Sequence, residues 1–330
     1  MITTRFTELV GCTIPIQQAG MGAVSPPELV AAVSEAGGLG MLGLAHPGLT
    51  AASLANRLDR LCALTDKPFG VNFIVAPMHL NGTSTRPPLD LKCIEIAARA
   101  AKVVEFFYGE PERRLVEMVH AGGALACWQV GSRQEAVAAA EAGCDFVIAQ
   151  GVESGGHVRG TSPVMTLLGE VISAVDVPVL AAGGIGTGRA MAAALAAGAD
   201  GVRVGTRFLA APEAAAHPEY VAALIASQAE DTIYTTAFSR SFPDAPHRVL
   251  RSCIAAAEAF QGDTVGEITA LDGTRMPALR LAAFGVDKTA TGTIAAMPLF
   301  AGTSVGAVTQ VEPAAEILRK LVDECVRERQ

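Results

Sequence analysis

The sequence predicts an α/β fold in which parallel strands alternate with helices, and two observations support this prediction. Short apolar runs alternate with helical patterns from the N-terminus to about Leu209. In addition, similar segments that end a helix in Ala-Gly and then start a strand recur at Ser34, Val119, Ala140 and Leu195. Short helix-to-strand links combined with longer strand-to-helix loops are typical of a parallel α/β fold.

The expected strands are near-continuous apolar runs, as strands covered on both faces should be. Eight such units within about 210 residues favour a closed (β/α)8 TIM barrel. A doubly wound open sheet is the alternative, but its glycine fingerprint follows the first strand, where this chain has only the loose match QAGMGAVS. The strands are expected at Ile14–Met21, Leu39–Ala45, Phe69–Ala76, Val103–Tyr108, Ala124–Val130, Phe146–Gln150, Val179–Ala182 and Gly201–Val204.

Helical patterns lie between these strands. Four of them should end at a glycine in the left-handed conformation that closes a helix, namely Gly37, Gly122, Gly143 and Gly198. The amphipathic segment Glu312–Arg329 could supply the eighth barrel helix. The helices are expected at Pro27–Ala36, Ala52–Leu64, Leu89–Ala100, Pro111–His120, Ser132–Ala142 and Gly188–Ala197.

The regular rhythm of strands and helices breaks after Leu209. Residues 212–300 contain helical patterns at Pro218–Gln228 and His247–Phe260, together with polar turns such as SFPDAPH. We therefore expect a small, mainly helical insertion on the substrate side. The barrel would then comprise residues 1–211 and 301–330.

Composition argues against several classes of protein. The net charge of −8 and the lack of lysine or arginine blocks argue against nucleic-acid binding. No apolar run of about 18 residues occurs, so we expect no membrane span, and the N-terminus lacks the regions of a signal peptide, so we expect a cytoplasmic protein. Seven scattered cysteines without a CxxC pair indicate reduced thiols and no metal site. The oligomeric state is left open between a monomer and a homodimer.

Two glycine-lined turns follow the last two expected strands. Gly183-Gly184 comes after the seventh strand and Gly205-Thr206 after the eighth. The loops after these strands are adjacent in a barrel and commonly bind phosphate. Backbone N–H groups in such turns, and at the start of the following helix, form anion sites. We therefore expect a phosphate here; the alternative is two ordinary tight turns.

His157 is the candidate catalytic residue. It follows Gly155-Gly156 just beyond the sixth expected strand, inside the expected pocket. Histidine is suited to acid or base chemistry near neutral pH, although a lone histidine is often structural. His217 precedes Pro218 at an expected helix start and should be structural. The remaining histidines, which show no metal-ligand spacing, are His46, His79, His120 and His247.

Three amides lie in or at the ends of apolar strands, at Asn72, Gln129 and Gln150. Buried amides must be hydrogen-bonded, so each could simply be satisfied inside the core. Because the strands converge at one end of a barrel, the three could instead bind a flat heteroaromatic ring together. Glu153 should anchor the His157 loop, with a substrate contact as the alternative.

Together, these motifs resemble the nitronate monooxygenase family of FMN enzymes, formerly called 2-nitropropane dioxygenases. The resemblance covers almost the whole chain and is weakest in the insertion. The matching segments are Thr4–Gly22, Lys67–Phe73, Ala149–Gly160, Val177–Ala210 and Leu299–Val308.

The resemblance implies a barrel that binds FMN at the C-terminal ends of its strands. Gly183, Gly184, Gly205 and Thr206 match the positions that hold the phosphate, and His157 matches the catalytic histidine. Some members carry lysine in place of Gln129 and aspartate in place of Gln150. The residues that would line the ring and ribityl chain are Met21, Gly22, Asn72, Gln129, Gln150 and Gly155.

The activity implied by the resemblance is oxidation of an alkyl nitronate or propionate-3-nitronate with O2 to a carbonyl compound and nitrite. The same motifs, with the Met165-Thr166-Leu167 helix start, are also similar to FMN-dependent enoyl-acyl-carrier-protein reductase II. The alternative is therefore NAD(P)H-dependent reduction of an enoyl thioester or a quinone. A flavin-binding protein without activity is a third reading.

Overall fold

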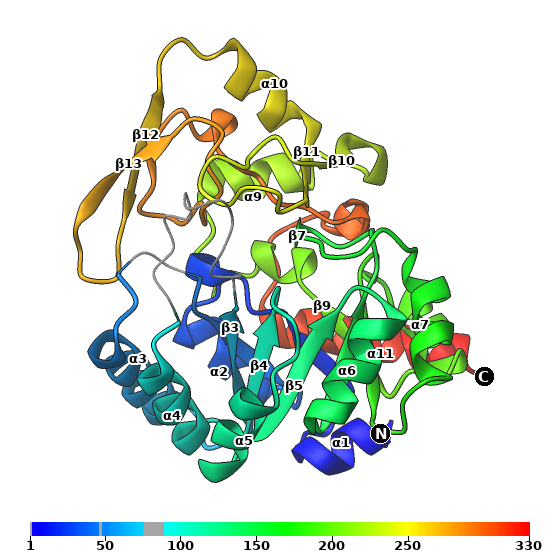
Figure 1. Cartoon of the computed structure of the whole chain (residues 1–330). Coiled ribbons are helices and arrows are strands. Elements are labelled where there is room, and N and C mark those ends of the chain that lie inside the picture. The colour runs from blue at the N-terminus through cyan, green and yellow to red at the C-terminus, as the bar shows by residue number, and fades with distance from the viewer. Residues whose placement is uncertain (1, 46–47, 76–88) are drawn as a thin grey trace.

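The structure is a computed structural model that describes residues 2–45, 48–75 and 89–330. Within them, eight parallel strands form one sheet in the order β1-β9-β8-β6-β5-β4-β3-β2. A parallel bridge between Gln17 and Leu39 joins the two outer strands and closes the sheet. The predicted (β/α)8 TIM barrel is confirmed (Figure 1). Its strands are β1 (Ile16–Gln18), β2 (Gly40–Gly43), β3 (Phe69–Ile74), β4 (Val103–Phe107), β5 (Leu125–Val130), β6 (Phe146–Gln150), β8 (Val179–Ala182) and β9 (Gly201–Val204).

Helices cover the outside of the barrel (Figure 1). The C-terminal helix α11 (Ala314–Glu328) packs against its neighbours α8 and α2, so it is the eighth barrel helix, as predicted. Its apolar face buries Ile317, Leu318 and Leu321. The other barrel helices are α2 (Pro27–Glu35), α3 (Ala51–Leu64), α4 (Leu91–Ala100), α5 (Arg113–Ala121), α6 (Arg133–Ala142), α7 (Val164–Ile172) and α8 (Gly188–Ala196).

A short N-terminal helix, α1 (Arg5–Val10), closes the end of the barrel opposite the insertion (Figure 1). Thr4 caps it, because the Thr4 side chain accepts a hydrogen bond from the Thr7 N–H. The buried ring of Phe6 lies 5.4 Å from the ring of Phe146. This helix was not among those predicted from the sequence.

The expected glycine caps are found at three of the four positions. Gly37, Gly143 and Gly198 have φ values of 95°, 99° and 101°. Gly122 has φ −82° instead, and the left-handed residue is its neighbour Gly123, with φ 91°. The prediction for Gly122 was wrong because α5 continues to Ala121, one residue beyond its expected end, which moves the cap by one position.

The segment 212–300 lies over the C-terminal ends of the barrel strands (Figure 1). The expectation that it is mainly helical is wrong, since its strands join two three-stranded sheets with the orders β10-β11-β7 and β13-β12-β14. Its elements are α9 (Pro218–Ile225), β10 (Thr232–Thr235), β11 (His247–Leu250), α10 (Arg251–Ala259), β12 (Thr264–Thr269), β13 (Arg275–Leu279) and β14 (Thr291–Gly292).

Long-range pairing explains the difference. His247–Leu250, expected as the start of a helix, forms β11 because it pairs with β10 on one side and with β7 (Gly156–His157) on the other. The hairpin of β12 and β13 turns at Asp272-Gly273, a dipeptide that favours tight turns, and Gly273 has φ 85°. A second hydrophobic cluster contains Leu224 and Val249 of the insertion together with Leu209 and Val305, which lie outside the segment 212–300. The boundaries of the insertion at 212 and 300 stay a prediction.

Candidate cofactor pocket and active site

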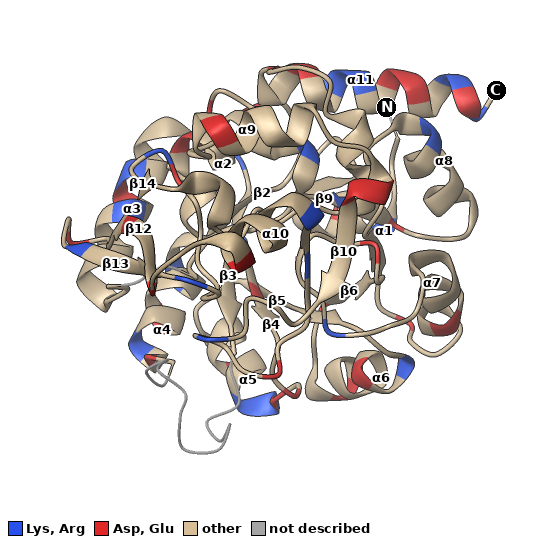
Figure 2. Ribbon diagram, turned by 90° about the horizontal axis from the view of Figure 1, so that it is seen from above, with Lys and Arg blue, Asp and Glu red and all other residues tan. Residues whose placement is uncertain are grey.

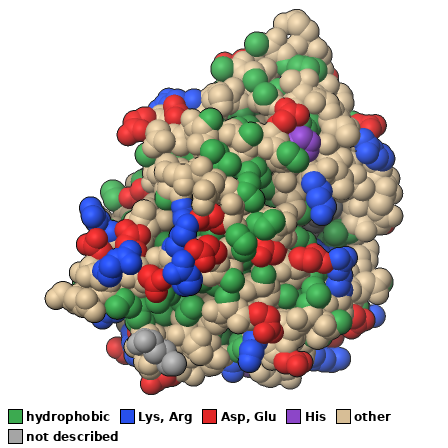
Figure 3. Space-filling view, turned by 180° about the vertical axis from the view of Figure 1, so that it is seen from behind, with side chains coloured by type: hydrophobic (Ala, Val, Ile, Leu, Met, Phe, Trp, Pro, Cys, Tyr) green, Lys and Arg blue, Asp and Glu red, His purple; other side chains and the backbone are tan. Residues whose placement is uncertain are grey.

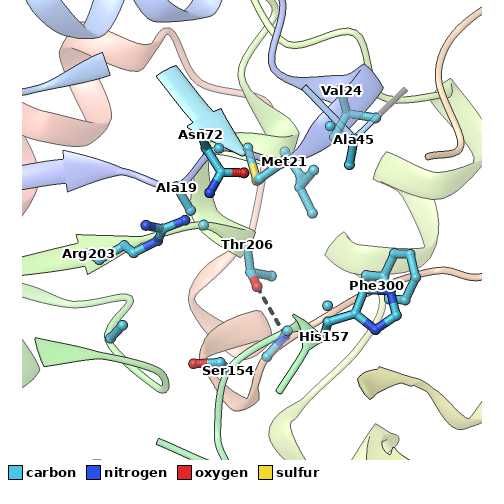
Figure 4. A pocket seen from close by; sticks show the side chains of 18 of the residues that line it. Ala19, Met21, Val24, Ala45, Asn72, Ser154, His157, Arg203, Thr206 and Phe300 are labelled. Atoms are coloured by element: carbon cyan, nitrogen blue, oxygen red, sulfur yellow. Dashed lines mark hydrogen bonds between the residues drawn. The ribbon is translucent and has the colours of Figure 1, made fainter. Parts of the chain in front are cut away.

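One pocket opens at the C-terminal ends of the barrel strands, and every residue predicted for the site lines it (Figure 4). Its open space, including the mouth, is about 1320 Å³. The roles of these residues stay predictions, whereas their convergence is a structural finding. The residues concerned are Met21, Gly22, Asn72, Gln129, Gln150, Gly155, His157, Gly183, Gly184, Gly205 and Thr206.

The two glycine turns form a cradle of backbone donors. Gly183 and Gly184 have φ values of 113° and 68°, which favour glycine. Within the described residues, the N–H groups of these glycines, of Gly205 and of Thr206 make no hydrogen bond. Thr206 accepts a hydrogen bond from the Gly302 N–H at 3.0 Å (Figure 4), which leaves its own proton free to donate. These donors fit a phosphate group.

The start of α8 does not add to this cradle as expected. The Gly188 N–H donates to Glu324 Oε2 at 2.7 Å, and the Ala190 N–H donates to Thr187 Oγ1 at 3.2 Å. These two donors of the first turn are therefore engaged by the protein. A Cβ atom on Gly183 would lie 2.7 Å from Ser154 Oγ, so the turn after β8 must stay free of side chains.

His157 lies in β7, which pairs antiparallel with β11 of the insertion. Aromatic rings surround its imidazole, with centroid distances of 5.0 Å to Phe242, 5.7 Å to Tyr108 and 5.9 Å to Phe300. The ring of His247 lies 5.7 Å away. Figure 4 shows His157 and Phe300 together on one side of the pocket. We call these four neighbours of His157 the aromatic box.

His247 of the aromatic box is fully buried, and both of its ring nitrogens are hydrogen-bonded. Nε2 accepts from the Phe238 N–H at 3.2 Å, so Nδ1 carries the proton and donates to the Ala245 carbonyl at 3.0 Å. Burial lowers the pKa of His247, although the hydrogen bond to Ala245 opposes the shift. A neutral neighbour leaves His157 free of charge repulsion from this side.

The three amides Asn72, Gln129 and Gln150 differ in their hydrogen-bond partners. Gln150 Nε2 donates to the His157 carbonyl at 2.9 Å, and Gln150 Oε1 accepts from the Arg159 N–H at 3.2 Å, so this amide holds the His157 loop. Asn72 Nδ2 donates to Glu105 Oε1 at 2.7 Å. Gln129 is 4% exposed, and its side chain makes no hydrogen bond to another described residue.

Two further contacts hold the His157 loop. Both carboxylate oxygens of Glu153 accept from the Val164 N–H, at 3.1 and 3.0 Å, so Glu153 anchors the loop to α7 as expected. Arg159 Nη1 donates to the carbonyl of Tyr108 at 2.8 Å. Tyr108 has φ 85°, and such strained residues cluster at functional sites.

A charged group that was not predicted from the sequence also lines the pocket. Arg203 on β9 forms an ion pair with Glu105 on β4, and Gln17 Nε2 donates to Glu105 Oε2 at 3.3 Å. The side chains of Arg203 and Glu105 are 7% and 0% exposed. The signal was present, since each residue interrupts an otherwise apolar strand, VVEFF and GVRV.

The insertion supplies an apolar wall to the pocket. This apolar wall consists of Tyr220, Phe284, Val286 and Phe300, and the hydroxyl of Tyr220 donates to the Phe300 carbonyl. A bulky apolar substrate group would fit against it.

The remaining histidines lie elsewhere. His217 Nδ1 caps α9 by accepting from the Glu219 N–H at 3.2 Å, which is the structural role expected. His120 pairs with Asp145 near the surface at 2.9 Å. His46 and His79 fall outside the described residues. Across the described part of the chain, no group of three His, Cys, Asp or Glu side chains is placed to hold a metal ion.

The charged side chains mix over the surface. Seen from above, the outer helices carry acidic and basic residues interspersed (Figure 2), and the back of the molecule shows the same mixture (Figure 3). No extended basic area of the kind that binds nucleic acid stands out on the face in Figure 3. No helix among the described residues is long and apolar enough to cross a bilayer.

Comparisons with known proteins cover both the barrel and the insertion. A family profile described as nitronate monooxygenase matches residues 3–324. A nitronate monooxygenase of Pseudomonas aeruginosa is 34% identical, over 98% of this chain and 99% of that protein. The (3aS,4S,5R,7aS)-5-hydroxy-7a-methyl-1-oxo-octahydro-1H-indene-4-carboxyl-CoA dehydrogenase of Rhodococcus jostii is 38% identical, over 82% of this chain and 71% of that protein. The solved structure of FabK from Thermotoga maritima matches with a TM-score of 0.79 at 30% identity, over 99% of this chain and 97% of that chain.

Proposed function

Because this chain belongs to the nitronate monooxygenase family, we propose that it is an FMN-dependent oxidoreductase that oxidises alkyl nitronates or propionate-3-nitronate with O2. The products would be a carbonyl compound and nitrite. The observation that carries the proposal is the meeting of an anion cradle and His157 in one pocket at the C-terminal end of the barrel.

The pocket fits FMN. The unbonded N–H groups of Gly183, Gly184, Gly205 and Thr206 would hold its single phosphate. The amide of Gln129 and the oxygen of Asn72 would bind the ring, while Gln150 would act by fixing the His157 loop. Met21, Gly22 and Gly155 would line the ring and ribityl chain. When bound, FMN would take electrons from the substrate and pass them to O2.

His157 would bind the anionic nitronate or remove the α-proton of a neutral nitroalkane. The aromatic box would fix the orientation of the imidazole and exclude water from the reacting atoms. Since Gln150 holds the backbone of His157, the position of the imidazole depends on that amide as well.

The second candidate function is the NAD(P)H-dependent reduction of an enoyl thioester or a quinone. The apolar wall supports it, because a small nitronate leaves such a surface uncovered. The relative from Rhodococcus jostii, named as a dehydrogenase of a coenzyme A thioester, supports a thioester substrate as well. His157 would then donate a proton to the acceptor or orient it.

One anaerobic experiment separates these functions. Purified protein should release FMN, and not FAD, on denaturation. The FMN-loaded protein is then mixed with NADH, NADPH or a nitronate, and the flavin absorbance is followed. Reduction by the nitronate alone supports the monooxygenase. Reduction by a pyridine nucleotide selects the reductase, and no reduction by any donor leaves a binding protein without activity.

A further inference from the structure

A buried cation faces the pocket from below. The side chain of Arg203 is 7% exposed, yet it lines the pocket. Its Nη1 atom contacts Glu105 and lies 3.5 Å from Gln17 Oε1. Its Nε and Nη2 atoms make no hydrogen bond to another described residue, so these two donors are directed to the pocket. Figure 4 shows the guanidinium on the same side of the pocket as Asn72.

The carboxylate that balances this cation is placed away from the pocket. Glu105 is fully buried and does not line the pocket. Besides Arg203, its oxygens accept from Asn72 Nδ2 at 2.7 Å and from Gln17 Nε2 at 3.3 Å, so the protein satisfies both. The ion pair therefore presents its positive end to a ligand.

No carboxylate offsets Arg203 among the described residues that line the pocket. Histidine aside, Arg203 is the one aspartate, glutamate, lysine or arginine in that lining. A buried ion pair is not expected to stabilise the fold more than apolar residues of similar size would. A cation with unbonded donors, in a pocket whose described lining holds no carboxylate, instead fits the binding of a negative or electron-rich group.

We propose that Arg203 binds the electron-rich edge of the FMN ring and stabilises the negative charge that the ring gains on reduction. The assignment rests on the proposed binding of FMN. Reduction by two electrons and one proton adds one negative charge to the ring. A cation in contact with the ring must therefore bind the reduced form more tightly than the oxidised form.

The wild-type protein allows a first test. FMN is titrated with dithionite in the presence of a reference dye, both free and bound to the protein. We expect a more positive midpoint potential for bound FMN than for free FMN, which means tighter binding of the reduced form. A more negative potential for bound FMN would overturn the assignment. This measurement needs no variant to fold and no substrate to be known.

Variants provide the second test. Arg203→Gln alone would leave Glu105 buried without a counter-charge, so the informative variant is the doubly neutral Glu105→Gln/Arg203→Gln. We expect its bound FMN to have a more negative potential than that of the wild type. We also expect the affinity for sulfite, an anion that adds to oxidised flavin, to fall by roughly ten-fold or more. Arg203→Lys keeps the charge and is the matched control, with most of both properties retained.

The outcomes distinguish the two proposals. If the wild type binds FMN and the doubly neutral variant keeps its potential and sulfite affinity, Arg203 does not contact the ring and only this assignment is wrong. If the wild type binds no FMN, the proposed function is wrong and the assignment falls with it. Loss of both properties in Arg203→Lys as well would show that the charge is not what matters.

Discussion

Replacing Gln150 and Gln129 in parallel separates two roles that look identical in the sequence. Gln150 makes two hydrogen bonds to the backbone of the His157 loop, whereas the side chain of Gln129 makes none to another described residue. Leucine has nearly the volume of glutamine but neither donates nor accepts. Gln150→Leu should therefore destabilise the protein itself, and Gln129→Leu should weaken cofactor binding.

The magnitude follows from the backbone groups that lose a partner. The Val158 N–H donates to the Pro246 carbonyl at 2.9 Å, so the neighbouring His157 C=O and Arg159 N–H turn away from β11 and toward Gln150. In Gln150→Leu both become unsatisfied, at about 1–3 kcal/mol each. At roughly 2 °C per kcal/mol for a chain of this size, the melting temperature should fall by about 4–12 °C.

Gln129→Leu should show the opposite pattern. Its amide is 4% exposed and has no protein partner to lose among the described residues, so the melting temperature of the FMN-free protein should change little. Loss of one hydrogen bond to the ring, about 0.5–1.5 kcal/mol, should weaken FMN binding by roughly 2- to 12-fold.

Two measurements are needed, both on FMN-free protein. Thermal unfolding gives the melting temperatures, and quenching of FMN fluorescence on titration gives the affinities. Two results would contradict this prediction: Gln150→Leu melts at the same temperature as the wild type, or both variants lose stability and affinity in the same proportion. In either case the two hydrogen bonds of Gln150 would not be what holds the His157 loop.

Three further predictions address the cradle, the imidazole and the aromatic box. Thr206→Val should weaken FMN binding by roughly ten-fold or more while leaving riboflavin binding unchanged, because riboflavin lacks the phosphate; equal losses for both ligands in fluorescence titrations would remove Thr206 from the cradle. His157→Ala should keep FMN but slow oxidation of a neutral nitroalkane by ~10²–10⁴, and that of a preformed nitronate less, in stopped-flow assays; wild-type rates for both would make His157 structural. Because burial lowers the pKa of His247 in the folded protein, this histidine takes up its proton in the unfolded chain before it does so in the folded one, as the pH falls below about 6.5. The stability that depends on this group is thus fully present above that pH and is lost below it. In His247→Gln, the free energy of unfolding measured with urea should therefore decline less steeply between pH 7.5 and 5; an unchanged decline would assign the pH dependence to other groups.

The barrel was predictable because its signals are local. Each of its strands falls within the range expected from apolar runs, and the glycine turns and His157 could be placed in one pocket from strand order alone. Barrel closure then brings together side chains that follow different strands, which is why the site residues converge.

What escaped prediction depends on contacts between distant segments. The two-residue strand β7 forms only because β11 pairs with it, and the dipeptide Gly156-His157 has no pattern that predicts a strand. The partners of Gln150 lie in a loop whose path the sequence does not determine. Glu105 and Arg203 were visible as charges in apolar strands, but their meeting across the interior requires the closed barrel.

The pairing of β7 with β11 limits how hybrid proteins could be built from relatives of this family. Exchanging residues 212–300 would also exchange β11, the strand whose register is set against Gly156 and His157. A graft chosen for a new substrate would thereby shift the imidazole of His157, even where the foreign residues never touch the substrate. The unit that can be transplanted as a whole is therefore larger than the insertion and includes the GGH loop beneath it.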